Sequence, residues 1–122
     1  MDSLELSKKV MNLLDDKKAL GIISIDVGKV TTLTDYFIIC NGTSDRHRKS
    51  LADDVQELME NEDVKMLSKE GYRTADWILL DYGYVVVNFF SEEAREKYSL
   101  ERLWSDGSLS ELRNMNVMEE TK

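Results

Sequence analysis

The sequence predicts an α/β fold, a single layered domain in which helices flank a mixed sheet of about five strands. Segments with the apolar spacing of helices alternate along the chain with short apolar runs that are typical of strands. Two such runs, residues 78–80 and 85–87, are joined by the tight turn Tyr82-Gly83. Both runs are too continuous for strands with one face in water. We therefore expect each strand to be covered on both faces, by the protein itself or by a partner.

The first half of the chain predicts two helices and two strands. Ser3 can cap a helix, and Ser44 can cap a second one over residues 45–61. Residues 22–27 and 36–40 have the pattern of strands, the second more buried than the first. The apolar stripes expected to face the core are Leu6, Val10, Leu13 and Leu14 on the first helix, and Leu51, Val55, Leu58 and Met59 on the second.

The second half predicts a weak strand at residues 64–67, a polar loop at 69–74, and then the two strong strands. Ser91 can cap a short helix, and a last turn carries Trp104, which we expect to pack on the last strands. Polarity then rises and periodicity fades. We therefore expect one domain over residues 1–106 and a polar tail over 107–122.

Composition limits the function. A chain of 122 residues with 42% hydrophobic content can form one core, and its formal net charge of −8 argues against a protein that works by neutralising phosphates. A single cysteine, Cys40, excludes an internal disulfide, and a single histidine excludes a multi-histidine metal site. We expect Cys40 to be a buried, inert thiol. No apolar leader or membrane-length run is present, so we expect a cytoplasmic protein.

Two blocks of residues carry a resemblance to a known family. The downstream block is ADWILLDYG at residues 75–83, followed by VVV, Arg95, Tyr98, Leu100-Glu101 and Leu103-Trp104. The upstream block is DYFII at residues 35–39, followed by Gly42-Thr43-Ser44, Arg46-His47 and Ala52-Asp53. In this order and spacing they resemble the bacterial ribosomal silencing factors, or Iojap family, over roughly residues 3 to 106. The chain departs from the family at Tyr84, where Asp is usual, and at Asn88, where His is usual.

The resemblance implies a nucleotidyltransferase-like core without catalytic activity or cofactor. It also implies a translational repressor that binds the large ribosomal subunit through its fourteenth protein and blocks joining with the small subunit during nutrient limitation. An acidic domain with an apolar, aromatic face suits a basic ribosomal protein. We expect a homodimer when the protein is free, and little direct binding of nucleic acid. A structural module whose apolar face only pairs with itself is a weaker alternative.

We expect the docking face on the strand over residues 76–81 and its turn. The strand repeat of two places Trp77, Leu79 and Asp81 on the face opposite Ile78 and Leu80. Trp77 could equally fill the core or contact a partner. The flanking carboxylates could form turns or the rim of the contact. The residues predicted to bind the partner are Asp76, Trp77, Leu79, Asp81, Tyr82 and Tyr84.

The turn Gly42-Thr43-Ser44 leaves a second function open, because N–H groups at a helix N-terminus can bind an anion. A small nucleotidyltransferase-like enzyme would need clustered carboxylates to hold two divalent ions. Asp76 and Asp81 point to opposite faces of a regular strand and cannot share a metal, so we favour a helix cap and expect no metal site.

A basic cluster follows the same turn. Arg46, His47 and Arg48, together with Ser44, are the one place where we expect contact with an anion or RNA, through the positive end of the helix dipole. The alternative is that these side chains only pack on the turn or face water.

Overall fold

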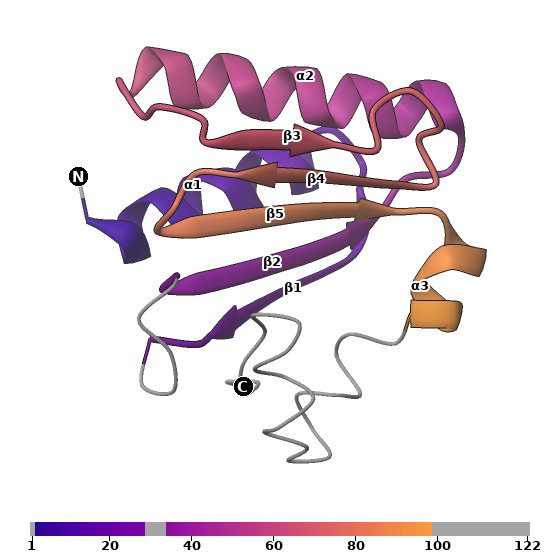
Figure 1. Ribbon diagram of the computed structural model, residues 1–122, viewed down its shortest axis with the longest axis horizontal. Helices are drawn as coiled ribbons and strands as arrows, with labels where there is room; N and C mark the ends of the chain where they lie inside the picture. Colours follow the sequence, from indigo (N-terminus) through magenta and orange to yellow (C-terminus); the bar gives the residue numbers. More distant parts are fainter. Residues whose placement is uncertain (1, 29–33, 99–122) are drawn as a thin grey trace.

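The computed structural model describes residues 2–28 and 34–98, which form an α/β domain with three helices and one five-stranded mixed sheet (Figure 1). In chain order the elements are α1 (Ser3–Asp16), β1 (Leu20–Asp26), β2 (Tyr36–Asn41), α2 (Asp45–Asn61), β3 (Ser68–Glu70), β4 (Trp77–Asp81), β5 (Val85–Phe90) and α3 (Glu92–Tyr98). The predicted fold class is confirmed. The expected last turn with Trp104, the domain end at 106 and the tail over 107–122 lie outside the described residues.

The sheet has the strand order β1-β2-β5-β4-β3. Only β2 and β5 run parallel, and the segment α2–β3–β4 connects them; the other neighbouring pairs are antiparallel. The predicted hairpin is confirmed, with Trp77 opposite Phe90 and Asp81 opposite Val86. Its turn is closed by a backbone hydrogen bond of 2.9 Å from Tyr82 N to Val85 O.

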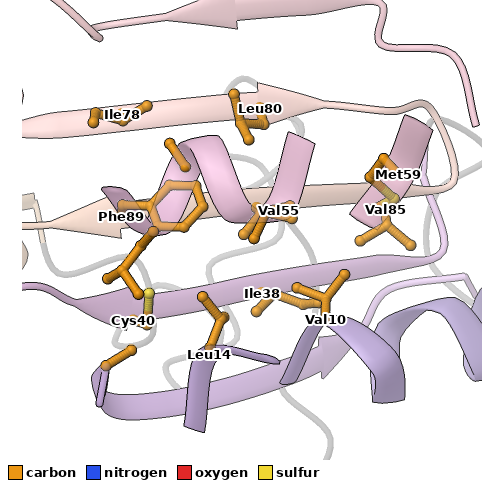
Figure 2. Packing of buried hydrophobic residues seen from close by; sticks show 14 of the residues in the cluster. Val10, Leu14, Ile38, Cys40, Val55, Met59, Ile78, Leu80, Val85 and Phe89 are labelled. Atoms are coloured by element: carbon orange, nitrogen blue, oxygen red, sulfur yellow. The ribbon is translucent and has the colours of Figure 1, made fainter. Parts of the chain in front are cut away.

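Helices α1 and α2 cover one face of the sheet and form the main hydrophobic core (Figure 2). The labelled side chains at its centre are Val10, Leu14, Ile38, Cys40, Val55, Met59, Ile78, Leu80, Val85 and Phe89. Cys40 is fully buried here, and burial raises the pKa of its thiol to about 12. The prediction of a buried thiol is confirmed, and because the thiolate is the reactive form, this one is inert near neutral pH.

The opposite face of the sheet carries a second apolar cluster. Its buried members are Ile25, Val27, Phe37, Ile39, Val86, Phe90 and Ala94, with Ile23, Trp77 and Leu79 packed against them. Ala94 comes from α3, which follows β5 directly and packs at that end of the strand (Figure 1). The strands therefore have apolar side chains on both faces, as their continuous apolar runs predicted.

Two local predictions were wrong. The cap of α1 is Asp2, whose Oδ1 accepts a hydrogen bond of 2.8 Å from Glu5 N, and Ser3 is already helical. The third strand is Ser68–Glu70 instead of residues 64–67, because backbone pairing with β4 fixes it and the apolar Leu67 before it is exposed. The predicted apolar stripes do face the core: most of their members are buried, and Leu13 and Leu58 are half-buried and pack against it.

Candidate partner-binding surface

Strand β4 separates a core face from a more exposed face, as its alternation predicted. Ile78 and Leu80 are completely buried beneath the helices. Trp77, Leu79 and Asp81 lie on the other face and are each half-buried. The strand thus carries three partly accessible side chains side by side, flanked by the second apolar cluster.

Trp77 is held by three neighbours on this face. Its ring stacks on Phe90 with the centroids 4.9 Å apart and packs on Tyr98 at 4.7 Å. Its indole Nε1 donates a 2.9 Å hydrogen bond to Oδ1 of Asn88. A buried indole N–H normally needs such a partner, so the ring is fixed in one orientation while part of its surface stays accessible.

Asn88, one of the two departures from the family, was not among the predicted site residues but is central to this surface. It is fully buried, and its Nδ2 donates to the Ile38 carbonyl at 3.2 Å while its Oδ1 receives the Trp77 indole proton. The signal was present in the sequence, because a lone amide inside a buried apolar strand must find hydrogen-bond partners. Its partners come from the two neighbouring strands.

The remaining predicted contact residues differ in whether a partner can reach them. Asp81 is a turn former, because its Oδ1 accepts a 2.8 Å hydrogen bond from Gly83 N, and Gly83 has a φ of +86° that favours glycine. Tyr84 is 68% exposed and Asp76 is also exposed, so both can reach a partner. Tyr82 cannot, because it is buried in the main core, where burial and the charge of Glu60 raise the pKa of its hydroxyl to about 12.

A hollow beside Trp77 adds acidic groups to this surface. It lies between β4 and α3, and its lining includes Thr74, Asp76, Glu93 and Lys97 along with the Trp77 ring. Two carboxylates and one ammonium therefore border the exposed part of the indole. We define the docking face as Asp76, Trp77, Leu79, Asp81 and Tyr84.

The expected basic cluster after the Gly42-Thr43-Ser44 turn does not form. Arg48 is only 5% exposed, and its guanidinium donates to the Gly42 carbonyl at 2.8 Å, to the Ala75 carbonyl and to Asp45. Buried charged groups need such complete pairing, so Arg48 is a structural residue that joins α2 to the chain before β4.

His47 is also used internally. Its Nδ1 accepts a 2.9 Å hydrogen bond from Thr43 N, and its Nε2 lies 3.0 Å from the Lys17 carbonyl. Because a backbone N–H can only donate, Nδ1 is the acceptor, and Nε2 is placed to donate to the Lys17 carbonyl. Of the expected cluster, Arg46 alone remains an exposed cation.

The turn itself is a helix cap. Ser44 Oγ accepts a 3.0 Å hydrogen bond from His47 N, as the N-cap prediction required. A Cβ at Gly42 would lie 2.5 Å from Arg48 Cγ, so the glycine makes room for the buried arginine. Among the described residues, no group of three or more His, Cys, Asp or Glu side chains could hold a metal ion. No helix in the described ranges is both long and apolar enough to cross a membrane.

Comparison with known proteins agrees with this fold. A family model described as "Ribosomal silencing factor during starvation" matches residues 1–122. The ribosomal silencing factor of Halalkalibacterium halodurans is 33% identical over 112 residues, which cover 92% of this chain and 96% of that protein. An Iojap-related mitochondrial protein of Arabidopsis thaliana is 32% identical over 120 residues, 89% of this chain and 65% of that protein.

A solved structure shows the same architecture. The crystal structure of a Chromobacterium violaceum protein superposes with a TM-score of 0.82 at 35% identity, covering 86% of this chain and 88% of that one. The family model matches the whole chain, and a relative is more than 30% identical over most of it. The similarity is therefore not limited to the short motifs found in the sequence. The chain belongs to the ribosomal silencing factor family, also called the Iojap family.

Proposed function

We propose that this protein binds the large ribosomal subunit through its fourteenth protein and blocks joining with the small subunit. The observation that supports this most is Trp77, a half-buried aromatic side chain already fixed by its neighbours on a strand whose other face is core. Tryptophan is enriched among the residues that dominate interface energies, and an ordered ring loses little conformational entropy on binding. A protein of a ribosome-silencing family thus offers a preformed anchor.

Charge favours a basic protein as the partner. The whole chain carries a formal net charge of −8, and Asp76 and Glu93 border the hollow beside Trp77. Ribosomal proteins that bind RNA are basic, so opposite potentials would meet at this surface and speed their encounter. A partner without positive charge would have to leave these carboxylates uncompensated.

The consequence for translation is steric. A domain docked on the large subunit, on the surface that meets the small subunit, would prevent the two from joining. This would lower translation in the cytoplasm when nutrients are limiting. The chemistry of the Gly42-Thr43-Ser44 turn plays no part, because the protein, like its family, is not an enzyme.

We propose that the free protein is a homodimer. Trp77, Leu79 and Tyr84 leave apolar surface in water, and such surface favours association with a second copy. Light scattering should therefore give the mass of two chains, and the mass of one chain at all concentrations would contradict the dimer without affecting ribosome binding.

Sedimentation with purified ribosomal subunits tests the main proposal. We expect the protein to pellet with large subunits at moderate salt, and to lower the yield of joined ribosomes when small subunits are added. A variant with Lys8→Gln, an exposed residue of α1 that is not part of the docking face, provides a control for handling losses. The proposal fails if the protein stays in the supernatant with large subunits, or if it pellets but joined ribosomes form in full yield.

A further inference from the structure

Two lysines from different elements lie close to the ring of Tyr72. Lys69 Nζ on β3 lies 3.9 Å from the ring centroid, and Lys49 Nζ on α2 lies 5.5 Å from it. Tyr72 follows β3 and is half-buried, and its hydroxyl donates a 3.1 Å hydrogen bond to Asp53 Oδ2. The ring attracts both ammonium groups through its negative face, so residues far apart in sequence form one cationic site.

These cations differ from two lysines of α1 and its C-cap. Lys9 forms an ion pair of 2.8 Å with Glu62, and Lys17 lies 4.0 Å from Asp54. Within residues 2–28 and 34–98, no carboxylate forms an ion pair with Lys49 or Lys69. Two ammonium groups near one ring make the local potential positive, which favours an anion nearby.

A third cation borders the same site. Arg46 precedes Lys49 by one helical turn, is exposed, and lines the same shallow hollow on α2. The two carboxylates of that hollow are already engaged: Asp53 accepts the Tyr72 hydrogen bond, and Asp54 lies near Lys17. We define the Tyr72 patch as Arg46, Lys49, Lys69 and Tyr72.

The Tyr72 patch lies on the helix side of the sheet, because Lys69 pairs with Leu80 and Lys49 is on α2, whereas the docking face is on the other side; the loop that connects β3 to β4 links the two. This loop passes the N-terminal end of α2 at the same end of the molecule as α3 (Figure 1). Thr74, two residues after Tyr72, lines the hollow beside Trp77. A partner as large as the ribosomal subunit therefore contacts both surfaces by covering the sheet edge formed by β3 as well.

We infer that the Tyr72 patch binds phosphates of ribosomal RNA on the helix side of the sheet, around the β3 edge from the protein contact made by the docking face. This inference rests on the proposed binding to the large subunit and adds a second chemistry to it. The lysine ammonium group is a compact charge that binds phosphate well, and the Tyr72 ring holds two such groups in place. A basic protein would be repelled by the three cations of the patch, whereas an RNA backbone supplies anions at regular spacing. The RNA contact thus shares Arg46 with the site that the sequence suggested, but its other cations are Lys49 and Lys69.

The salt dependence of binding measures this contact. Each phosphate neutralised by a protein cation adds about 0.7 to 0.9 to the slope of log affinity against log salt. The variant with Lys49→Gln and Lys69→Gln should lower the slope for purified large subunits by roughly 1.5 and weaken binding about tenfold at low salt. The matched control replaces Lys8 and Lys65, two exposed lysines that also lack an ion pair in the described ranges, by Gln and should keep the parental slope.

A crosslink identifies what the patch touches. Ser50 is exposed and lines the same hollow as Arg46 and Lys49, so a photoreactive benzophenone amino acid can replace it without entering the core. We expect it to crosslink to RNA of the large subunit. Crosslinks to ribosomal protein alone, or a slope change equal to that of the control, would overturn the RNA contact while leaving the docking face intact.

The outcomes separate this inference from the proposed function. Trp77→Ala should weaken binding at every salt concentration with its slope unchanged, since it removes an apolar contact. If the parent protein does not bind large subunits at all, both proposals are wrong. If it binds, and the double lysine variant behaves as the control does, only the phosphate contact is wrong.

Discussion

The two faces of β4 use alternate residues of one strand for different purposes. Ile78 and Leu80 are completely buried under α1 and α2, where any change meets closely packed neighbours. Trp77 and Leu79, on the other face, are ordered but only half-buried. The family motif of this strand therefore contains residues needed for folding and residues available for binding. Single substitutions can test the two roles separately.

The adjacent leucines of β4 give the largest expected contrast. Leu80→Ala removes a fully buried side chain and should lower the free energy of unfolding by about 2 to 5 kcal/mol, whereas Leu79→Ala should cost about 1 kcal/mol. Urea denaturation followed by circular dichroism measures both. For large-subunit binding by the folded fraction we expect the reverse, a loss for Leu79→Ala and none for Leu80→Ala. Equal effects of the two changes on unfolding would show that the faces do not differ.

Trp77→Ala should have the largest effect on binding. Truncation of a buried aromatic anchor costs about 2 kcal/mol or more, roughly thirtyfold in affinity for the large subunit. Because the ring also stacks on Phe90 and Tyr98, some stability will be lost as well, and circular dichroism must confirm the fold. Trp77→Phe is the control that retains a ring for stacking. If Trp77→Ala stays folded and binds as tightly as the parent, the tryptophan belongs to the core and the interface lies elsewhere.

Asn88 tests whether the orientation of Trp77 matters. Asn88→Leu leaves the indole N–H and the Ile38 carbonyl without their partner, which should cost about 1 to 3 kcal/mol in stability. Asn88→His introduces the residue usual in the family, and a neutral imidazole can accept at one nitrogen and donate at the other. We expect this variant to be more stable than Asn88→Leu near neutral pH.

The same histidine variant should respond to pH in a way that the parent does not. Protonation below the usual imidazole pKa of about 6.5 removes the acceptor for the indole, so stability should fall as the pH is lowered through that range. Thermal unfolding at several pH values, with the parent measured in parallel, checks this. Identical pH profiles would mean that the residue at this position does not hold Trp77 through a hydrogen bond.

Local signals in the sequence predicted most of the fold. The hairpin of β4 and β5 was evident from two apolar runs and a glycine turn, and the start of α2 from Ser44, because each depends on residues close in sequence. Strand β3 was misplaced because its pairing with β4 decides its position. Its three residues are polar and show no apolar signal of their own.

The candidate site was predicted only in part, for the same reason. The strand repeat placed Trp77 and Leu79 on one face, but the burial of Arg48 depends on the Ala75 carbonyl, 27 residues away. A charged residue in the first turn of a helix looks like surface until the distant chain that covers it is known. The Tyr72 patch could not be predicted from the sequence for the same reason, because Lys49 is on α2 and lies far from Tyr72 along the chain.

The smallest expected effects concern the rim of the docking face. Tyr84→Asp introduces the residue usual in the family at a position that is 68% exposed, so stability should change by less than about 0.5 kcal/mol. An added carboxylate should speed association with a basic partner and steepen its salt dependence. Asp81→Asn should do the opposite, slowing association a few-fold, while its amide oxygen can still accept from Gly83 N and preserve the turn. Stopped-flow or surface-binding kinetics at two salt concentrations separate association from dissociation. A fall of more than about tenfold in the affinity of folded Tyr84→Asp would show that the tyrosine ring is itself an anchor, so that this chain has replaced an ionic contact with an aromatic one.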